Sequence, residues 1–231
     1  MGYDLYLWYF TLYKLKTLKF DKNENDFFYF LKLIPKQGIA LDIGANIGLM
    51  SYYMAKSIDK VYAFEPMPNN FNVIEKLISR FSLNNLSLQK CALGKTSGII
   101  KLVLPIVEGV KKQGLSHVVA DKMTEFNEGI EFETDCFRLD EINTFKNTKV
   151  SAIKIDVENF EFEVFQGAEE LLVRDKPIIY CELWDNKNRE DCFNYLSKLG
   201  YSINIYTKGG LTEINSNPNN VQNFFFIPKQ A

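Results

Sequence analysis

The chain has 231 residues, of which 46% are hydrophobic and 24% charged, and a formal net charge of -2 at pH 7. These values are typical of a globular protein and exclude general disorder, and the length fits one α/β domain with modest additions. No run reaches the roughly 18 apolar residues that a membrane span needs. The slightly acidic balance disfavours a nucleic-acid partner, because such proteins usually carry a basic face.

The chain opens with an aromatic and then basic stretch, YDLYLWYFTLYKLKTLK. We interpret residues 1–37 as an N-terminal helical extension and residues 38–231 as the main domain. The aromatic side chains of the extension also suit a membrane surface or a homo-oligomer interface. The opening residues do not have the pattern of a secretion signal, and the four cysteines form no CxxC pair. A cytoplasmic location with reduced thiols is therefore expected.

From residue 38 onward, apolar strand-like runs alternate with helix-like segments, a pattern typical of a mostly parallel sheet with helices on both faces. Seven strands are expected, at residues 39–43, 60–64, 86–92, 151–156, 178–183, 201–206 and 223–227. Helices are expected between them, at residues 47–57, 69–81, 160–172 and 188–199. Between residues 94 and 140 the alternation gives way to an inserted hairpin of residues 99–104 and 130–137, and such insertions often carry substrate loops.

The end of the first expected strand reads LDIGANIG, residues 41–48. Gly44 and Gly48 let the backbone there approach a ligand closely. A dinucleotide fingerprint would have a glycine at Asn46, so NAD is disfavoured. The zwitterionic end of S-adenosylmethionine suits a small turn of this kind. The backbone amides of the turn, including the amide of Ala45, would meet the methionine carboxylate, and the acidic Asp42 lies beneath the turn.

Glu65 ends the second expected strand, about 20 residues after the first glycine, where a carboxylate can accept both ribose hydroxyls of a nucleoside. It is equally a carboxylate that stabilises the start of a helix near Pro66 or Pro68. Given the two glycines, we favour the ribose role. Ala92, at the end of the third expected strand, lies where an adenine ring is commonly packed.

Several motifs occur in one order along the chain: ALDIGANIG, AFEPMPNN, CALG, LDEI, IKIDVENFEFEVFQGAEELL and IIYCELW. In this order and approximate spacing they resemble the FkbM-type methyltransferases, over roughly residues 38–230. The resemblance implies a Rossmann-like class I methyltransferase fold, with S-adenosylmethionine as the cofactor and direct methyl transfer to an oxygen atom. The substrates it implies are sugars, macrolides or other natural products, and we expect a small-molecule sugar, nucleotide-activated or glycan-linked, of the bacterial surface polysaccharide type.

The most specific motif carries charged residues at the end of an apolar strand. Lys154, Asp156 and Glu158 project to the same side of an extended segment, and Glu182 ends the next strand at the same edge of the sheet. Buried charges must be paired, so Lys154 forms either a structural pair with Asp156 or part of the site. Asp156 and Glu182 are suited to act as bases or to bind a divalent cation.

Two residues stand apart from this pattern. His117, the single histidine, falls in the inserted segment, where it suits a general base or a solvated surface position. Asn159 stands where the FkbM-type family usually carries glycine, and asparagine tolerates the left-handed backbone conformation best after glycine.

Other protein classes fit the sequence less well. Methylation of amino groups usually accompanies an Asn/Asp-Pro-Pro-aromatic run, and residues 156–159 read DVEN instead. The middle glycine that an NAD(P)-dependent dehydrogenase would carry is absent from this sequence. A non-catalytic binding protein would not need Asp156 and Glu182. An O-methyltransferase of a non-sugar natural product stays as an alternative to the sugar enzyme.

Overall fold

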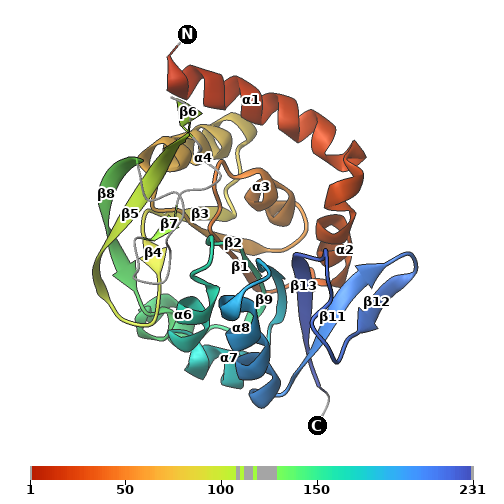
Figure 1. The fold of residues 1–231 in the computed structure, drawn as a ribbon. Coiled ribbons are helices and arrows are strands. Elements are labelled where there is room, and N and C mark those ends of the chain that lie inside the picture. The colour runs from red at the N-terminus through yellow and green to blue at the C-terminus, as the bar shows by residue number, and fades with distance from the viewer. Residues whose placement is uncertain (1, 108–109, 112–116, 119–128, 230–231) are drawn as a thin grey trace.

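The computed structural model describes residues 2–107, 110–111, 117–118 and 129–229. Their centre is an eight-stranded sheet in the order β12-β11-β13-β10-β9-β1-β2-β3 (Figure 1). Its strands are β1 (Ile39–Ile43), β2 (Lys60–Phe64), β3 (Leu86–Gln89), β9 (Val150–Ile155), β10 (Ile178–Glu182), β11 (Tyr201–Thr207), β12 (Gly210–Glu213) and β13 (Asn223–Pro228).

The sheet has a parallel half and an antiparallel half. Strands β3, β2, β1, β9 and β10 pair in parallel, whereas β13 is antiparallel to both β10 and β11. The expected count of seven strands was wrong by one, because β12 adds an eighth through a hairpin with β11. This strand is short and largely exposed, so its sequence carries no buried apolar pattern.

Helices cover both faces of the sheet, as expected. Helices α6 (Glu161–Gln166), α7 (Glu169–Asp175) and α8 (Lys187–Lys198) pack on one face, and α2 (Asn25–Leu33), α3 (Leu49–Ala55) and α4 (Pro68–Phe81) pack on the other. The prediction of a single helix over residues 160–172 was wrong, because the helix breaks at Gly167. The backbones of Gly167 and Gly94 touch there, and a Cβ at Gly167 would lie 2.0 Å from the Gly94 carbonyl oxygen.

The N-terminal segment is helical, with α1 (Tyr3–Thr17), two short 3-10 turns (Leu18–Phe20 and Lys22–Glu24) and then α2. Helix α1 buries Leu7, Thr11 and Leu15 and lies beside α3 and α4 (Figure 1). Its aromatic side chains Tyr6, Tyr9, Phe10 and Tyr13 are exposed, and this face stays the predicted surface for a homo-oligomer. Within the described residues, no helix combines the length and apolar character of a membrane span.

The inserted segment forms a second sheet beside the first. Its long hairpin pairs β5 (Gly98–Val107) with β8 (Gly129–Phe137), close to the expected ranges. The short strands β4 (Ala92–Leu93), β6 (Val110–Lys111) and β7 (His117–Val118) complete it. The third expected strand, 86–92, was therefore too long: the central sheet keeps residues 86–89, and Ala92 pairs with Cys136 of β8 instead.

Candidate active site

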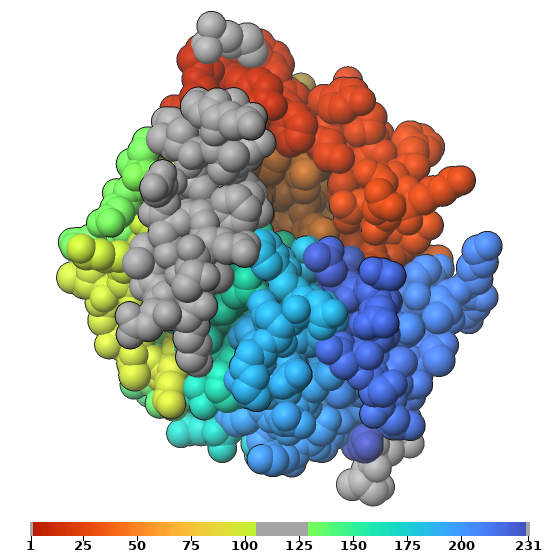
Figure 2. Space-filling model, in the orientation of Figure 1, coloured from red at the N-terminus to blue at the C-terminus, as the bar shows by residue number. Residues whose placement is uncertain are grey.

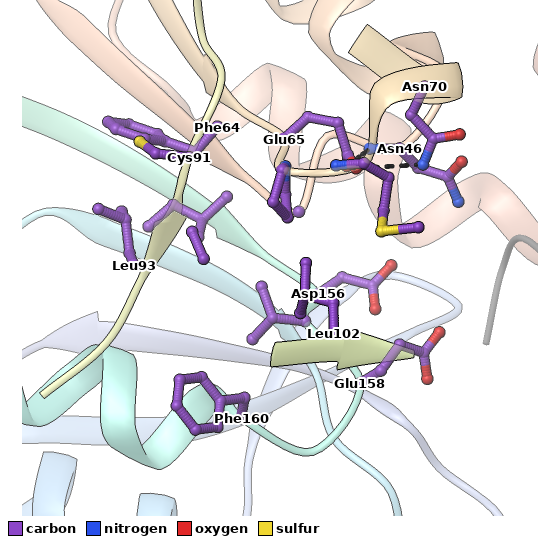
Figure 3. Close-up of a pocket in the computed structure, with 16 residues that line it drawn as sticks. Asn46, Phe64, Glu65, Asn70, Cys91, Leu93, Leu102, Asp156, Glu158 and Phe160 are labelled. Carbon is purple, nitrogen blue, oxygen red and sulfur yellow. Dashed lines mark hydrogen bonds between the residues drawn. The ribbon is translucent and has the colours of Figure 1, made fainter. Parts of the chain in front are cut away.

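A cavity with about 670 Å³ of empty space, part of it open to solvent, lies at the carboxyl ends of β1, β2 and β9, between the two sheets. In Figure 3, most of the apolar side chains lie on one side of this cavity and the polar side chains on the other, with Leu102 beside Asp156. The apolar group comprises Phe64, Cys91, Leu93 and Phe160, and the polar group comprises Asn46, Glu65, Asn70, Asp156 and Glu158. We call it the cofactor cavity. Such an arrangement suits a ligand with a flat apolar ring and a charged end.

The turn after β1 forms the floor of the cofactor cavity. Gly44 has a φ of 76°, and a Cβ there would lie 1.8 Å from the carbonyl oxygen of Asp156, so this close approach requires glycine. Asn46 also adopts a left-handed conformation, with a φ of 50°. Gly48 immediately precedes α3 as its N-cap, and a Cβ there would lie 2.9 Å from the side chain of Ile74.

Glu65 is buried directly after β2, with only 4% of its surface exposed. Its carboxylate accepts hydrogen bonds from the amides of Asn46 (2.8 Å) and Met67 (2.9 Å) and from Nδ2 of Asn70 (3.1 Å). Burial raises the pKa of Glu65 to about 7, and these hydrogen bonds oppose the rise. A carboxylate has about four acceptor positions, so the predicted capture of two ribose hydroxyls needs one of these three bonds to yield.

Asp42 and Lys154 form a buried pair beneath the turn. The ammonium of Lys154 lies 3.3 Å from Oδ1 of Asp42 and donates to the Gly44 carbonyl at 2.9 Å, and Ser51 donates to Oδ2 of Asp42. Burial alone would lower the pKa of Lys154, but the carboxylates of Asp42 and Asp156 raise it above its ordinary value. Lys154 is therefore charged, and its pairing with Asp42 fixes the turn.

The predicted cofactor residues divide into two groups. Gly44, Asn46, Glu65 and Ala92 line the cofactor cavity. Asp42, Ala45 and Gly48 are not among its described lining residues, and neither is Lys154. These four residues shape the turn instead. For Lys154 this agrees with the alternative that it forms a structural ion pair. Its main partner in that pair is Asp42, whereas its distance to Asp156 is 3.8 Å.

Three acidic residues gather at the rim of the cofactor cavity. Asp156 and Glu158 line it, and Glu182 ends the adjacent strand β10. Burial raises the pKa of Glu158 to about 9, with the charges of Asp156 and Glu182 adding to the effect. Burial and Asp156 likewise raise the pKa of Glu182 to about 7. Near neutral pH Glu158 is thus protonated, so it acts as a hydrogen-bond donor rather than as a base.

The rim turn is held in an unusual conformation. Glu158 and Asn159 have consecutive φ values of 54° and 71°, so Asn159 adopts the left-handed conformation that its place in the motif suggested. Asn186 donates a hydrogen bond to its side chain at 2.6 Å. The Oε2 atom of Glu158 is buried and has no hydrogen-bond partner among the described residues, which leaves it available to a ligand.

Sequence reasoning missed some of the residues that matter here. Glu161, 1% exposed, accepts hydrogen bonds from the amide of Val157 (3.0 Å) and from Asn188 (2.6 Å), and so braces the rim turn. A carboxylate in the first turn of a helix such as α6 ordinarily stabilises the helix start. The sequence therefore gave no reason to predict that Glu161 braces the rim turn. Phe160 and Asn70 also line the cavity, and no local signal marked them.

Two predictions concern a base and a metal. The backbone of His117 pairs with Val103 of β5, but its side chain lies outside what the structure describes, so its role as a general base stays a prediction. Across residues 2–107, 110–111, 117–118 and 129–229, no group of three or more His, Cys, Asp or Glu side chains is placed to hold a metal ion. A cation at Asp156 and Glu182 would need further ligands from water or substrate.

The sequence matches the model of the methyltransferase FkbM domain over residues 42–203. The chain belongs to this family. It is 26% identical to Methyltransferase 1 of Beauveria bassiana over 153 residues, 59% of this chain and 60% of that protein. The expected family is thereby confirmed, and S-adenosylmethionine stays the predicted cofactor.

Solved structures agree on the fold. FkbM methyltransferase from Methylobacillus flagellatus superposes with a TM-score of 0.57 at 15% identity, over 84% of this chain and 45% of that one. A Streptococcus mutans methyltransferase solved in complex with SAH gives 0.53 at 12% identity, over 89% and 96%. The expected Rossmann-like methyltransferase fold is thereby confirmed. The chain spans about half to three fifths of the length of these first relatives.

Proposed function

We propose that this FkbM-family chain transfers a methyl group from S-adenosylmethionine to a hydroxyl group of a sugar. One observation carries the proposal: the two-sided cofactor cavity opens at the carboxyl edge of the sheet directly onto Asp156 and Glu158, with Glu182 on the neighbouring strand. In open α/β sheets this edge is where ligands bind. The cavity therefore offers a nucleoside site and a proton-accepting rim side by side.

The residues present fit the cofactor. Leu93 and Phe160 supply apolar contact for an adenine ring, Glu65 an acceptor for ribose, and the turn of Gly44 and Asn46 a place for the methionine end. The unpartnered Oε2 of Glu158 is a further polar contact that a ligand would satisfy. When bound, S-adenosylmethionine supplies an electrophilic methyl group on its sulfonium.

The chain's own part in the chemistry is to orient the acceptor and to take its proton. Glu182 has a pKa near the operating pH, which is the optimum for a general base. Asp156, 31% exposed in its side chain, is the second carboxylate that can face an acceptor hydroxyl. Protonated Glu158 would donate a hydrogen bond to the acceptor oxygen or to the cofactor, and holding both reactants in line contributes further to the rate.

Other features of the chain support a location in the cytoplasm and an acceptor that is not nucleic acid. All four cysteines are buried and free, as expected in a reducing compartment. The net charge of -2 favours a small-molecule acceptor over nucleic acid.

The test begins with calorimetric titration of the full chain with S-adenosylmethionine and with NADH. We expect binding of the first, and preferential binding of NADH would overturn the proposal. Methyl transfer to a broad sugar panel follows, with Asp156→Ala, Glu182→Ala and His117→Ala, each with and without a chelator. Loss of activity in the rim variants supports a carboxylate base, loss on chelation alone supports a cation, and no transfer to any sugar would contradict the sugar substrate.

A further inference from the structure

A second cavity lies at the same edge of the central sheet, beyond β10. It holds about 1390 Å³ of empty space, open to solvent. Its lining comes from residues 22, 23, 25 and 26 around the start of α2, Asp185 after β10, Tyr206 of β11 and residues 220–223 at the start of β13. Since β11 runs in the same direction as β10, all of these segments meet at the carboxyl edge. Figure 2 shows the orange N-terminal segment and the blue C-terminal segments facing each other here. We call this the polar cavity.

The lining of the polar cavity is rich in groups that both donate and accept hydrogen bonds. Amide side chains of this kind come from Asn23, Asn25, Asn220, Gln222 and Asn223. Sugar hydroxyls also donate and accept, so one amide can bond to a hydroxyl in either sense. The aromatic ring of Tyr206, held by Tyr29 at a centroid distance of 4.9 Å, adds a flat apolar surface. The cofactor cavity, by contrast, has a largely apolar wall.

Charges in the polar cavity cancel. Lys22 and Arg189 are matched by Asp26 and Asp185. Arg189 is 1% exposed and committed to the fold, because its guanidinium donates to the carbonyls of Leu183 (2.7 Å) and Val221 (3.0 Å) and lies 3.2 Å from Asp185. A nucleotide diphosphate needs several free cations or free helix amides. This lining offers one exposed lysine and the start of α2, where Asp26 places a negative charge and accepts the hydrogen bond of the Phe27 amide at 2.8 Å.

Glu182 lies on β10 between residues of the two cavities, although it is in the described lining of neither. It is the register partner of Asn223, which lines the polar cavity. The negative charges of Asp156, near the cofactor cavity, and of Glu24 and Asp26, near the polar cavity, all raise the pKa of Glu182. Glu182 therefore lies between the rim of the cofactor cavity and the polar cavity, where a proton acceptor would meet the end of a bound chain.

We propose that the polar cavity binds the neutral glycan portion of the acceptor, so that the substrate is an uncharged oligosaccharide or glycan-linked sugar rather than a sugar nucleotide. This inference rests on the proposed sugar methylation. Amide side chains and a tyrosine ring hold the sugar units, and Arg189 fixes the 217–223 segment against β10, so that one wall of the cavity is already in place before binding.

The test uses saturation-transfer NMR on the full chain with two probe sets: neutral oligosaccharides together with methyl glycosides, and UDP- and GDP-sugars. We expect neutral glycans to give a saturation-transfer signal. The double variant Gln222→Ala with Asn223→Ala should weaken glycan binding about tenfold, the equivalent of two lost hydrogen bonds. Asn84→Ala, an exposed amide at the opposite edge of the sheet, serves as the matched control. Tyr206→Ala is a second variant, should the double variant not fold.

Calorimetry with S-adenosylmethionine on the same samples separates this inference from the proposed function. Cofactor affinity should stay within about twofold of the wild type in every polar-cavity variant, since none of these residues lines the cofactor cavity. Glycan binding without cofactor binding would contradict the proposed function alone. No response from any neutral glycan, a response that survives the substitutions, or a sugar-nucleotide response lost in the same variants would overturn the inference.

Discussion

The two cavities at the sheet edge are built in different ways. The cofactor cavity comes largely from strand ends and the turns directly after them, with its backbone so close that Gly44 admits no side chain. The polar cavity comes from four segments that are distant in the sequence and is wide and open. A rigid, closely packed site suits a cofactor common to a whole family, and an open polar site suits an acceptor that varies.

The largest effect we expect comes from Gly44→Ala. A Cβ there would lie 1.8 Å from the Asp156 carbonyl oxygen at a φ of 76°, so the turn and the rim must move apart. We expect a loss of at least about 5 kcal/mol of unfolding free energy, at the top of the range for single substitutions. Urea unfolding measures it, with Gly209→Ala as the control, because that glycine also has positive φ but no atom within 4 Å of its Cβ position. Equal losses in both variants would contradict the close approach.

Next in size is Lys154→Met, which leaves Asp42 as a buried, uncompensated charge. Removing one partner of a buried pair costs about 3–5 kcal/mol. The same unfolding experiment checks this, and Asp42→Asn added to Lys154→Met should restore part of the loss. A cost below about 1 kcal/mol would show that the pair does not hold the turn.

Glu182→Gln tests the rim. The raised pKa means that Glu182 is protonated below about 7 and can accept a proton only above it, so wild-type methyl transfer should rise with pH through about 7. Glu182→Gln should lower kcat about 100-fold and remove that rise. Glu170→Gln, at an exposed position of α7, is the control. An unchanged pH profile in Glu182→Gln would exclude it as the base.

The smallest effect is expected from Asn159→Gly, which restores the residue usual in the family. Glycine removes the strain at a φ of 71° but loses the hydrogen bond from Asn186. These effects oppose each other, so stability should change by less than about 1 kcal/mol, with activity retained. A large loss measured by thermal unfolding would mean that the Asn186 contact organises the rim.

The sequence predicted what depends on contiguous patterns. Apolar periodicity gave the strands and helices, and the glycines and Glu65 gave one side of the cofactor cavity. It missed the helix break at Gly167, which depends on a contact with Gly94 from far along the chain. It also missed the polar cavity, since asparagines such as Asn23 and Asn220 are ordinary loop residues until folding brings them together.

The proposed function requires the cavity between Glu65 and Phe160 to hold S-adenosylmethionine. A crystal structure of the full chain with S-adenosylhomocysteine would place the nucleoside. We predict the adenine ring beside Leu93 and Phe160, a ribose hydroxyl on the carboxylate of Glu65, and the sulfur facing Asp156. Nucleoside density in the polar cavity, or a cofactor cavity that stays without nucleoside at saturating ligand, would contradict it.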